Sequence, residues 1–111
     1  MSESPNKRVL IVDNDEEEAA RLGTELQRAG YDSNATWSGL DALKLLKSGT
    51  YDVLLVSSYL PDVYVGDFVQ RLNRLPERPC TIVMQEGFTS GALLKDVKNV
   101  IEERSVRQNE G

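Results

Sequence analysis

Acidic residues stand at a point in this sequence where they could bind a cation. Asp13, Asn14 and Asp15 directly follow a run of apolar residues at positions 9–12. Carboxylate oxygens are the ligands that hard cations such as Mg²⁺ prefer, so a weak metal site that includes Asp13 is one interpretation. The alternative is structural, because Asp or Asn at this point caps a following helix and favours its dipole. The sequence leaves both open.

Two serines follow another apolar run. Ser57 and Ser58 come directly after residues 53–56. A serine hydroxyl is a weak nucleophile without an adjacent base, and the sequence contains no histidine to serve as one. We therefore expect these serines to satisfy loop hydrogen bonds, with a regulatory phosphoserine as the alternative. A glycine-rich phosphate loop is also missing, so we expect no enzymatic activity.

The elements that position these residues alternate between strand and helix patterns. Apolar or β-branched segments predict strands at residues 8–12, 31–36, 53–56 and 81–84. A segment with helical spacing of apolar residues follows each strand. This fourfold repeat predicts an α/β fold with a doubly wound parallel sheet and right-handed crossovers. The polar composition of residues 31–36 predicts that this strand lies at an edge.

Capping and breaking residues set the expected helix ends. The first helix is expected to run from a cap at residues 13–15 to about Ala29, with Gly30 as its stop. Ser38 caps the second helix, which ends at Gly49. Pro76 and Pro79 close the third helix, which bears the apolar residues Phe68, Val69, Leu72 and Leu75. The fourth helix is expected at residues 90–104, followed by a frayed polar tail.

The predicted topology gathers the polar residues at one edge. Ligands of open parallel sheets bind beyond the carboxyl ends of the strands. Any site should therefore be built from the residues that follow the first, third and fourth strands, which are Asp13, Asn14, Asp15, Ser57, Ser58, Gln85, Glu86 and Gly87. Trp37, Tyr59 and Tyr64 are expected near the same edge, either as cover for the core or as anchors for a partner.

Composition limits the class of protein. The 111 residues fit a single domain, 1–111, with a core at about residues 7–104. A net charge of −5 opposes binding to nucleic acid or anionic membranes. With Cys80 as the one cysteine, expected to be a small buried hydrophobe, neither an intramolecular disulfide nor a zinc site is expected. The lack of an apolar leader or span favours the cytoplasm.

Several short motifs together resemble a known family. They follow one another in this order: Val-Leu-Ile-Val-Asp at 9–13, Gly-Tyr at 30–31, Trp-Ser-Gly at 37–39, Asp-Ala-Leu at 41–43, Tyr-Asp at 51–52 and Leu-Pro at 60–61. In order and spacing they resemble the receiver domain of response regulators (CheY-like) from two-component phosphorelay signalling. The resemblance implies a flavodoxin-like sheet and a magnesium-dependent phosphoryl switch.

Only part of that switch matches this sequence. Receivers hold magnesium with an acidic pair after the first strand and an aspartate at the end of the third, which accepts the phosphoryl group. The first acid matches Asp13, the second position holds Asn14, although Asp15 could lend a carboxylate, and the acceptor position holds Ser57. The resemblance therefore implies a residual acidic pocket with a degenerate acceptor. We expect no bound cofactor beyond weak Mg²⁺ at Asp13.

The switch residues that sense phosphate in receivers are also replaced. A hydroxyl residue is expected after the fourth strand, where this chain has Met84 or, with a shift of one residue, Gln85. The Lys-Pro-Phe of the family corresponds to Glu86, Gly87 and Phe88. Methionine cannot donate a hydrogen bond to a phosphoryl oxygen, and a glutamate would repel one.

The chain is shorter than a full receiver. Between Met84 and the last helix, a receiver has a further helix and strand, on the order of 20 residues by ordinary element lengths. We therefore expect four strands in the order 2-1-3-4, without the usual fourth helix and fifth strand. The fourth strand then becomes an apolar edge, which predicts a homodimer or a partner that covers it.

These expectations define one principal function and one alternative. The principal one is an atypical, truncated pseudo-receiver that acts as a phosphorylation-independent protein–protein interaction module. Its expected partners are a signalling kinase, a regulator or an output protein. The alternative is a working receiver that is switched by phosphorylation at a non-standard residue or by residual cation binding.

Overall fold

The computed structural model of the protein describes residues 7–75 and 78–110. The chain alternates four strands with four helices: β1 (Arg8–Val12), α1 (Glu16–Arg28), β2 (Asp32–Thr36), α2 (Gly39–Ser48), β3 (Val53–Ser57), α3 (Val65–Leu72), β4 (Cys80–Met84) and α4 (Ser90–Glu110). All strand pairs are parallel, and the strand order is β2-β1-β3-β4. This confirms the predicted α/β fold and its topology.

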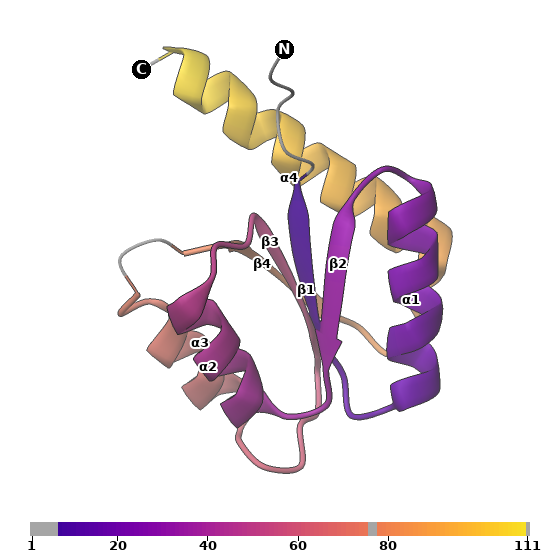
Figure 1. Ribbon diagram of the computed structural model, residues 1–111, viewed down its shortest axis with the longest axis vertical. Helices are drawn as coiled ribbons and strands as arrows, with labels where there is room; N and C mark the ends of the chain where they lie inside the picture. The colour runs from indigo at the N-terminus through magenta and orange to yellow at the C-terminus, as the bar shows by residue number, and fades with distance from the viewer. Residues whose placement is uncertain (1–6, 76–77, 111) are drawn as a thin grey trace.

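The sheet separates two hydrophobic clusters, each covered by two helices (Figure 1). Leu10, Val12, Leu54 and Val56 point to the side of α2 and α3, where Phe68 is fully buried. The alternate strand residues point to the other side, where α1 and α4 pack. Residues 9–12 of β1 and 53–56 of β3 are buried on both faces of the sheet, which accounts for their continuously apolar sequences.

Capping residues explain where the first two helices begin. The Asp15 carboxylate accepts a hydrogen bond from the N–H of Glu18, so Asp15 is the N-cap of α1. The Ser38 hydroxyl accepts one from the N–H of Asp41 and caps α2. After α1 the chain turns at Gly30, whose φ of 98° disfavours a residue with a side chain.

The last helix differs from its prediction in length. The expected frayed tail after residue 104 is wrong, because α4 continues to Glu110. Residues 105–110 contain neither glycine nor proline, and they extend a helix whose packed part is already formed. Leu93 and Val97 bury this helix against the α1 face of the sheet. No helix in the described part of the chain is long and apolar enough to cross a membrane.

Smaller differences concern the third helix and the strand ends. Helix α3 ends at Leu72, and Leu75 lies beyond it but still packs against the α2–α3 side of the core. Pro76 lies outside the described residues. Strand β4 begins at Cys80, one residue earlier than predicted, and β2 begins at Asp32, one residue later. The thiol of Cys80 is partly buried and free.

Candidate functional site

The carboxyl ends of the three neighbouring strands bring most of the predicted site residues together. Val12 of β1 pairs with Val56 of β3, so the residues that follow them, Asp13 and Ser57, are neighbours at the sheet edge. Ser57 in turn pairs with Met84 at the end of β4. The sheet therefore places one carboxylate, one hydroxyl and one thioether side by side.

Asp13 is the buried member of this set. Its side chain is 2% exposed, and its N–H donates a hydrogen bond to the carbonyl of Thr36. Oδ1 accepts the N–H of Asp15 at 3.0 Å. Oδ2 is buried and has no hydrogen-bond partner among the described residues. A buried carboxylate oxygen without a donor is costly, so a hydrogen-bond donor or a cation beside this atom would be stabilising.

Glu18 of α1 is the acidic side chain whose pKa responds most to this carboxylate. A hydrogen bond to Asp13, helped by desolvation and by the negative charges of Asp13 and Asp15, raises the pKa of Glu18 to about 7. Arg21 opposes this effect from 3.8 Å. A carboxylate has no proton to donate, so Glu18 can satisfy Asp13 only when it is protonated. Glu18 is not among the site residues predicted from the sequence. The Asp-x-x-Glu spacing at 15–18 indicates a helix start, but in a capping box the glutamate would face the N–H of Asp15, and that group donates to Asp13 instead.

The other predicted acidic-pocket residues are used elsewhere. Asn14 is exposed. The Asp15 carboxylate serves as the cap of α1. The structural interpretation therefore accounts for Asp15, whereas Oδ2 of Asp13 has a donor only when Glu18 is protonated.

Ser57 is engaged within its own loop. Its hydroxyl oxygen accepts a hydrogen bond from the N–H of Tyr59 at 3.3 Å. Ser58 is exposed. An ST-turn of this kind is the usual role of a serine at the end of a strand.

This donor set does not fit the magnesium ion that the resemblance implies. Magnesium requires near-octahedral oxygen ligands, commonly with more than one carboxylate. Of the two carboxylates that directly follow β1, Asp15 caps α1 and only Asp13 has no capping role, and Ser57 adds a neutral hydroxyl. Among the described residues, no group of three or more His, Cys, Asp or Glu side chains could hold a metal.

The loop after β4, residues 85–89, contains no lysine that could match the lysine of a receiver. Met84 is buried in the core under α1 and α4, while Gln85 and Glu86 are exposed. The N–H of Phe88 donates to the carbonyl of Gln85, which closes a tight turn with Gly87 at φ 83°. The chain passes through this turn directly toward α4, so Met84 ends β4 and Glu86 lies in the turn rather than at the end of a fifth strand.

Asp62 was missed as a functional residue. Its carboxylate accepts hydrogen bonds from the N–H groups of Gly39 and Leu40 and from the Ser38 hydroxyl, at 2.8 to 3.1 Å. Desolvation raises its pKa, but the hydrogen bonds from Leu40, Ser38 and Gly39 outweigh this and lower the pKa below its ordinary value. These contacts fasten the β3–α3 loop to the start of α2. No local sequence signal reveals a contact between residues so far apart in the chain.

Exposed aromatic side chains lie in the β3–α3 loop and just before α2. Trp37 is 44% exposed, Tyr59 66% and Tyr64 83%. None of the three belongs to either buried cluster. These three aromatic residues were expected either to cover the core or to anchor a partner, and their exposure favours the second interpretation.

Comparisons with known proteins agree with this architecture. No protein-family model and no curated protein sequence matches the chain. Several solved structures do. A signal receiver domain from Vibrio parahaemolyticus superposes with a TM-score of 0.85 at 14% identity, covering 93% of this chain and 95% of that one.

Two further structures extend the likeness. A response regulator receiver domain protein (CheY-like) from Methanospirillum hungatei JF-1 has a TM-score of 0.80 at 18% identity, covering 96% of this chain and 99% of that chain. A response regulator signal receiver domain from Bermanella marisrubri has a TM-score of 0.80 at 20% identity, covering 86% and 98%. The chain therefore has the fold of the CheY-like receiver domains of response regulators.

Proposed function

We propose that this chain is a pseudo-receiver of two-component signalling, which binds a protein partner without accepting a phosphoryl group. The observation that carries the proposal is Ser57 at the carboxyl end of β3, beside Asp13. An acyl phosphate forms when a carboxylate oxygen attacks phosphorus, and serine has no carboxylate. No histidine is present in the sequence to activate the hydroxyl instead.

A fixed loop supports the same proposal. The β3–α3 loop is held to α2 through Asp62, which favours one conformation of this end of the molecule. A partner could still shift a two-state equilibrium, but only by binding one state more tightly than the other. Exposed Trp37, Tyr59 and Tyr64 supply the kind of aromatic anchors that protein interfaces use.

The edge of the sheet supports binding to a second copy. Strand β4 is the last strand of the sheet in the described part of the chain, and it has no charged side chain. The proposed partners are therefore another copy of the chain at this edge and a signalling protein at the carboxyl ends of the strands. The net charge of −5 argues against nucleic acid as the partner.

A second candidate function rests on the unpaired Oδ2 of Asp13. A cation there, or phosphorylation of Ser57 by a separate kinase, would give a switch of non-standard chemistry. Weak affinity is expected for a single carboxylate ligand.

Intact mass measurement after incubation with magnesium and a small phosphoryl donor separates the two candidates. The proposal predicts no mass gain in the wild type. A gain that disappears with hydroxylamine would show an acyl phosphate and overturn the proposal. A gain that resists hydroxylamine and is lost in Ser57→Ala would identify phosphoserine and support the second candidate.

A further inference from the structure

The two edges of the sheet differ in how they oppose pairing with another strand. Edge strand β2 is polar and carries the exposed Asp32. Edge strand β4 has the sequence Cys-Thr-Ile-Val-Met, without a charge or a proline. Natural proteins usually protect edge strands with charged residues or proline. Because β4 has neither, it lacks the usual obstacles to pairing with another strand.

Backbone geometry identifies which groups of β4 face outward. The N–H of Cys80 donates to the carbonyl of Asp52, toward β3. Because successive residues of a strand turn their N–H and C=O groups to opposite sides, Thr81 and Val83 direct theirs away from β3. The free edge therefore offers two donors and two acceptors, and the side chain of Thr81 is exposed beside them.

We propose that a second copy of this chain pairs with β4 in antiparallel orientation, about a two-fold axis at Ile82. This deepens the proposed function by naming the partner at this edge and its register. Thr81 would form a hydrogen-bonded pair with Val83 of the second copy, and Val83 with its Thr81. Ile82 would face its own counterpart across the axis. The outward N–H and C=O groups of each β4 strand thus pair with those of the other, and both copies use the same surface, as a two-fold interface requires.

Charge favours this antiparallel orientation. Arg78 stands four residues before Ile82, and Glu86 stands four residues after it. Both residues lie outside β4, with Glu86 in the turn closed by Gln85 and Phe88. Antiparallel pairing of the two β4 strands therefore brings the segment that carries Arg78 beside the turn that carries Glu86 of the second copy, twice per dimer. Opposite charges across an interface fix register and help to offset the repulsion between two chains of net charge −5.

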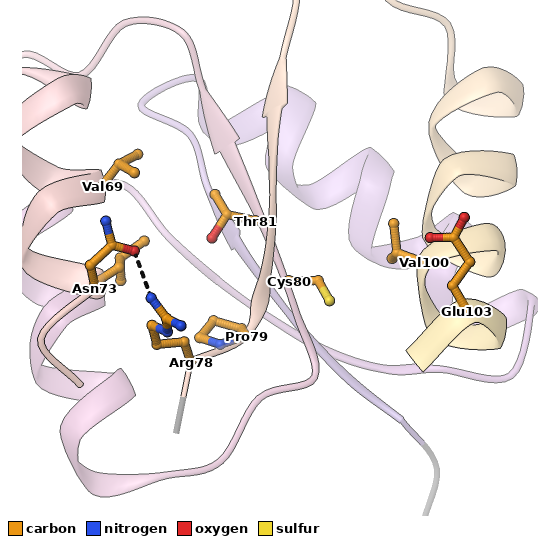
Figure 2. Close-up of a pocket in the computed structure, with 9 residues that line it drawn as sticks. Val69, Asn73, Arg78, Pro79, Cys80, Thr81, Val100 and Glu103 are labelled. Atoms are coloured by element: carbon orange, nitrogen blue, oxygen red, sulfur yellow. Dashed lines mark hydrogen bonds between the residues drawn. The ribbon is translucent and has the colours of Figure 1, made fainter. Parts of the chain in front are cut away.

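The surface beside β4 has space for the end of a second strand. An open hollow of about 420 Å³ lies at the start of β4 between α3 and α4, and Figure 2 shows the residues around it. Val69 and Val100 line it from the two helices. Arg78 donates a hydrogen bond to Oδ1 of Asn73 at 3.1 Å, on the α3 side, while Glu103 lies on the α4 side. The antiparallel register directs the end of β4 from the second copy, with its Glu86, toward this hollow.

Cross-linking tests the register directly. Ile82→Cys, made together with Cys80→Ala, brings two cysteines to a non-hydrogen-bonded pair about 4.5 Å apart between Cα atoms, within disulfide range. Cys80 of the wild type is the matched control, because each Cys80 faces Met84 of the other copy and lies roughly 13 Å along the strand from its counterpart. Mild oxidation should give a covalent dimer from the Ile82→Cys protein alone. A covalent dimer from both proteins, or from neither, would overturn the register.

Charge reversal measures the same pairing in solution. Arg78→Glu or Glu86→Arg alone should weaken the dimer roughly tenfold by sedimentation equilibrium, since each reversal creates two like-charge contacts. The double reversal should restore the affinity to within about threefold, because the opposite charges again face each other. Two reversals that simply add, or a wild type that stays monomeric at tens of micromolar, would overturn the proposal.

A backbone variant tests the strand edge itself. Thr81→Pro removes an outward N–H, which an edge strand tolerates, and should weaken the dimer about tenfold or more. Thr81→Val keeps the N–H and should dimerise as the wild type does. Equal dimerisation of both variants would contradict edge pairing. None of these variants touches Asp13 or Ser57, so failure here leaves the phosphoryl test of the proposed function unaffected.

Discussion

The carboxylate of Asp62 accepts a hydrogen bond from the backbone N–H of Gly39 at 3.1 Å. This contact joins the β3–α3 loop to the first turn of α2, and the N–H of Leu40 and the hydroxyl of Ser38 strengthen it. A negative charge at a helix N-terminus is stabilising, and here it comes from a distant loop. The loop next to Ser57 is thereby tied to the body of the domain.

Replacing this carboxylate tests its contribution to stability. Asp62→Asn should lower the free energy of unfolding at pH 7 by about 1 kcal/mol, as the loss of a helix cap usually does. The pKa of Asp62 is lowered in the fold, so its contribution is present above the unfolded value of 3.8 and is lost as pH falls through the folded pKa. Urea unfolding at pH 7 and below pH 3 checks this. Asp96→Asn, at an exposed position inside α4 and beyond its first turn, is the control and should change little. If Asp62→Asn and the wild type have equal free energies of unfolding at pH 7, the hydrogen bonds of Asp62 to the start of α2 do not stabilise the fold.

A methyl group at Gly39 tests how closely the same loop packs. The Cβ of Gly39→Ala would clash with Cγ1 of Val63 and crowd Leu60. We expect a loss of about 1 to 2 kcal/mol, because the loop must shift. Gly66→Ala, where a Cβ meets nothing within 4 Å, should instead stabilise the protein by about 0.5 to 1 kcal/mol as a helical glycine-to-alanine change. The midpoints of thermal unfolding of the two variants should shift in opposite directions relative to the wild type. Shifts in the same direction would contradict the close packing at Gly39.

The pair of Glu18 and Asp13 predicts an unusual pH dependence. The folded pKa of Glu18 is raised to about 7 from 4.5, so its stabilising contribution is full below pH 4.5 and is lost as pH rises through 7. Glu18→Gln keeps a donor toward Asp13 at every pH. It should therefore be more stable than the wild type at pH 8, by roughly 1 kcal/mol after allowance for solvent screening, and similar at pH 4.

A neighbouring substitution separates this effect from a general change of charge. Glu17→Gln removes an exposed carboxylate one position earlier in α1 and should show no such crossover. Denaturant midpoints measured from pH 4 to pH 8 compare the three proteins. If the Glu18 and Glu17 variants follow the same pH profile, the interaction with Asp13 does not exist in solution.

Two substitutions should restore a cation site. Asn14→Asp with Ser57→Asp adds two carboxylates beside Asp13, and we expect Mg²⁺ affinity to rise at least about tenfold over the wild type. Asn14→Asp with Ser58→Asp adds the same charge one residue further from the strand end and serves as the control. Magnesium titration followed by amide chemical shifts measures both. Equal gains in the two double variants would mean that charge alone, rather than position, governs binding.

The sequence predicted the fold well because each element carried its own local signal. The apolar runs of β1 and β3 report burial on both faces, and Ser38 and Gly49 mark the ends of α2 by capping chemistry. The continuation of α4 to Glu110 was missed because its polar end carries no apolar pattern. Helix extension from a packed segment needs no such pattern.

The candidate site was only partly predictable for a different reason. Asp13 and Ser57 could be placed together because parallel strands end at the same edge of a sheet. The roles of Asp62 and Glu18 depend on distances between side chains that belong to different elements or to successive helical turns. Such contacts follow from packing, which residue types and spacing do not specify.

Amide-resolved NMR tests the central claim most directly. The protein is titrated with Mg²⁺ and then with Mg²⁺ plus beryllium fluoride, which mimics a bound phosphoryl group. Because Ser57 lacks the carboxylate that an acyl phosphate requires, the amides of Asp13, Ser57 and the β3–α3 loop should keep their positions throughout. Saturable shifts that begin at Asp13 and Ser57 and spread along α2 and α3 would contradict the account and show a domain that still responds to phosphorylation.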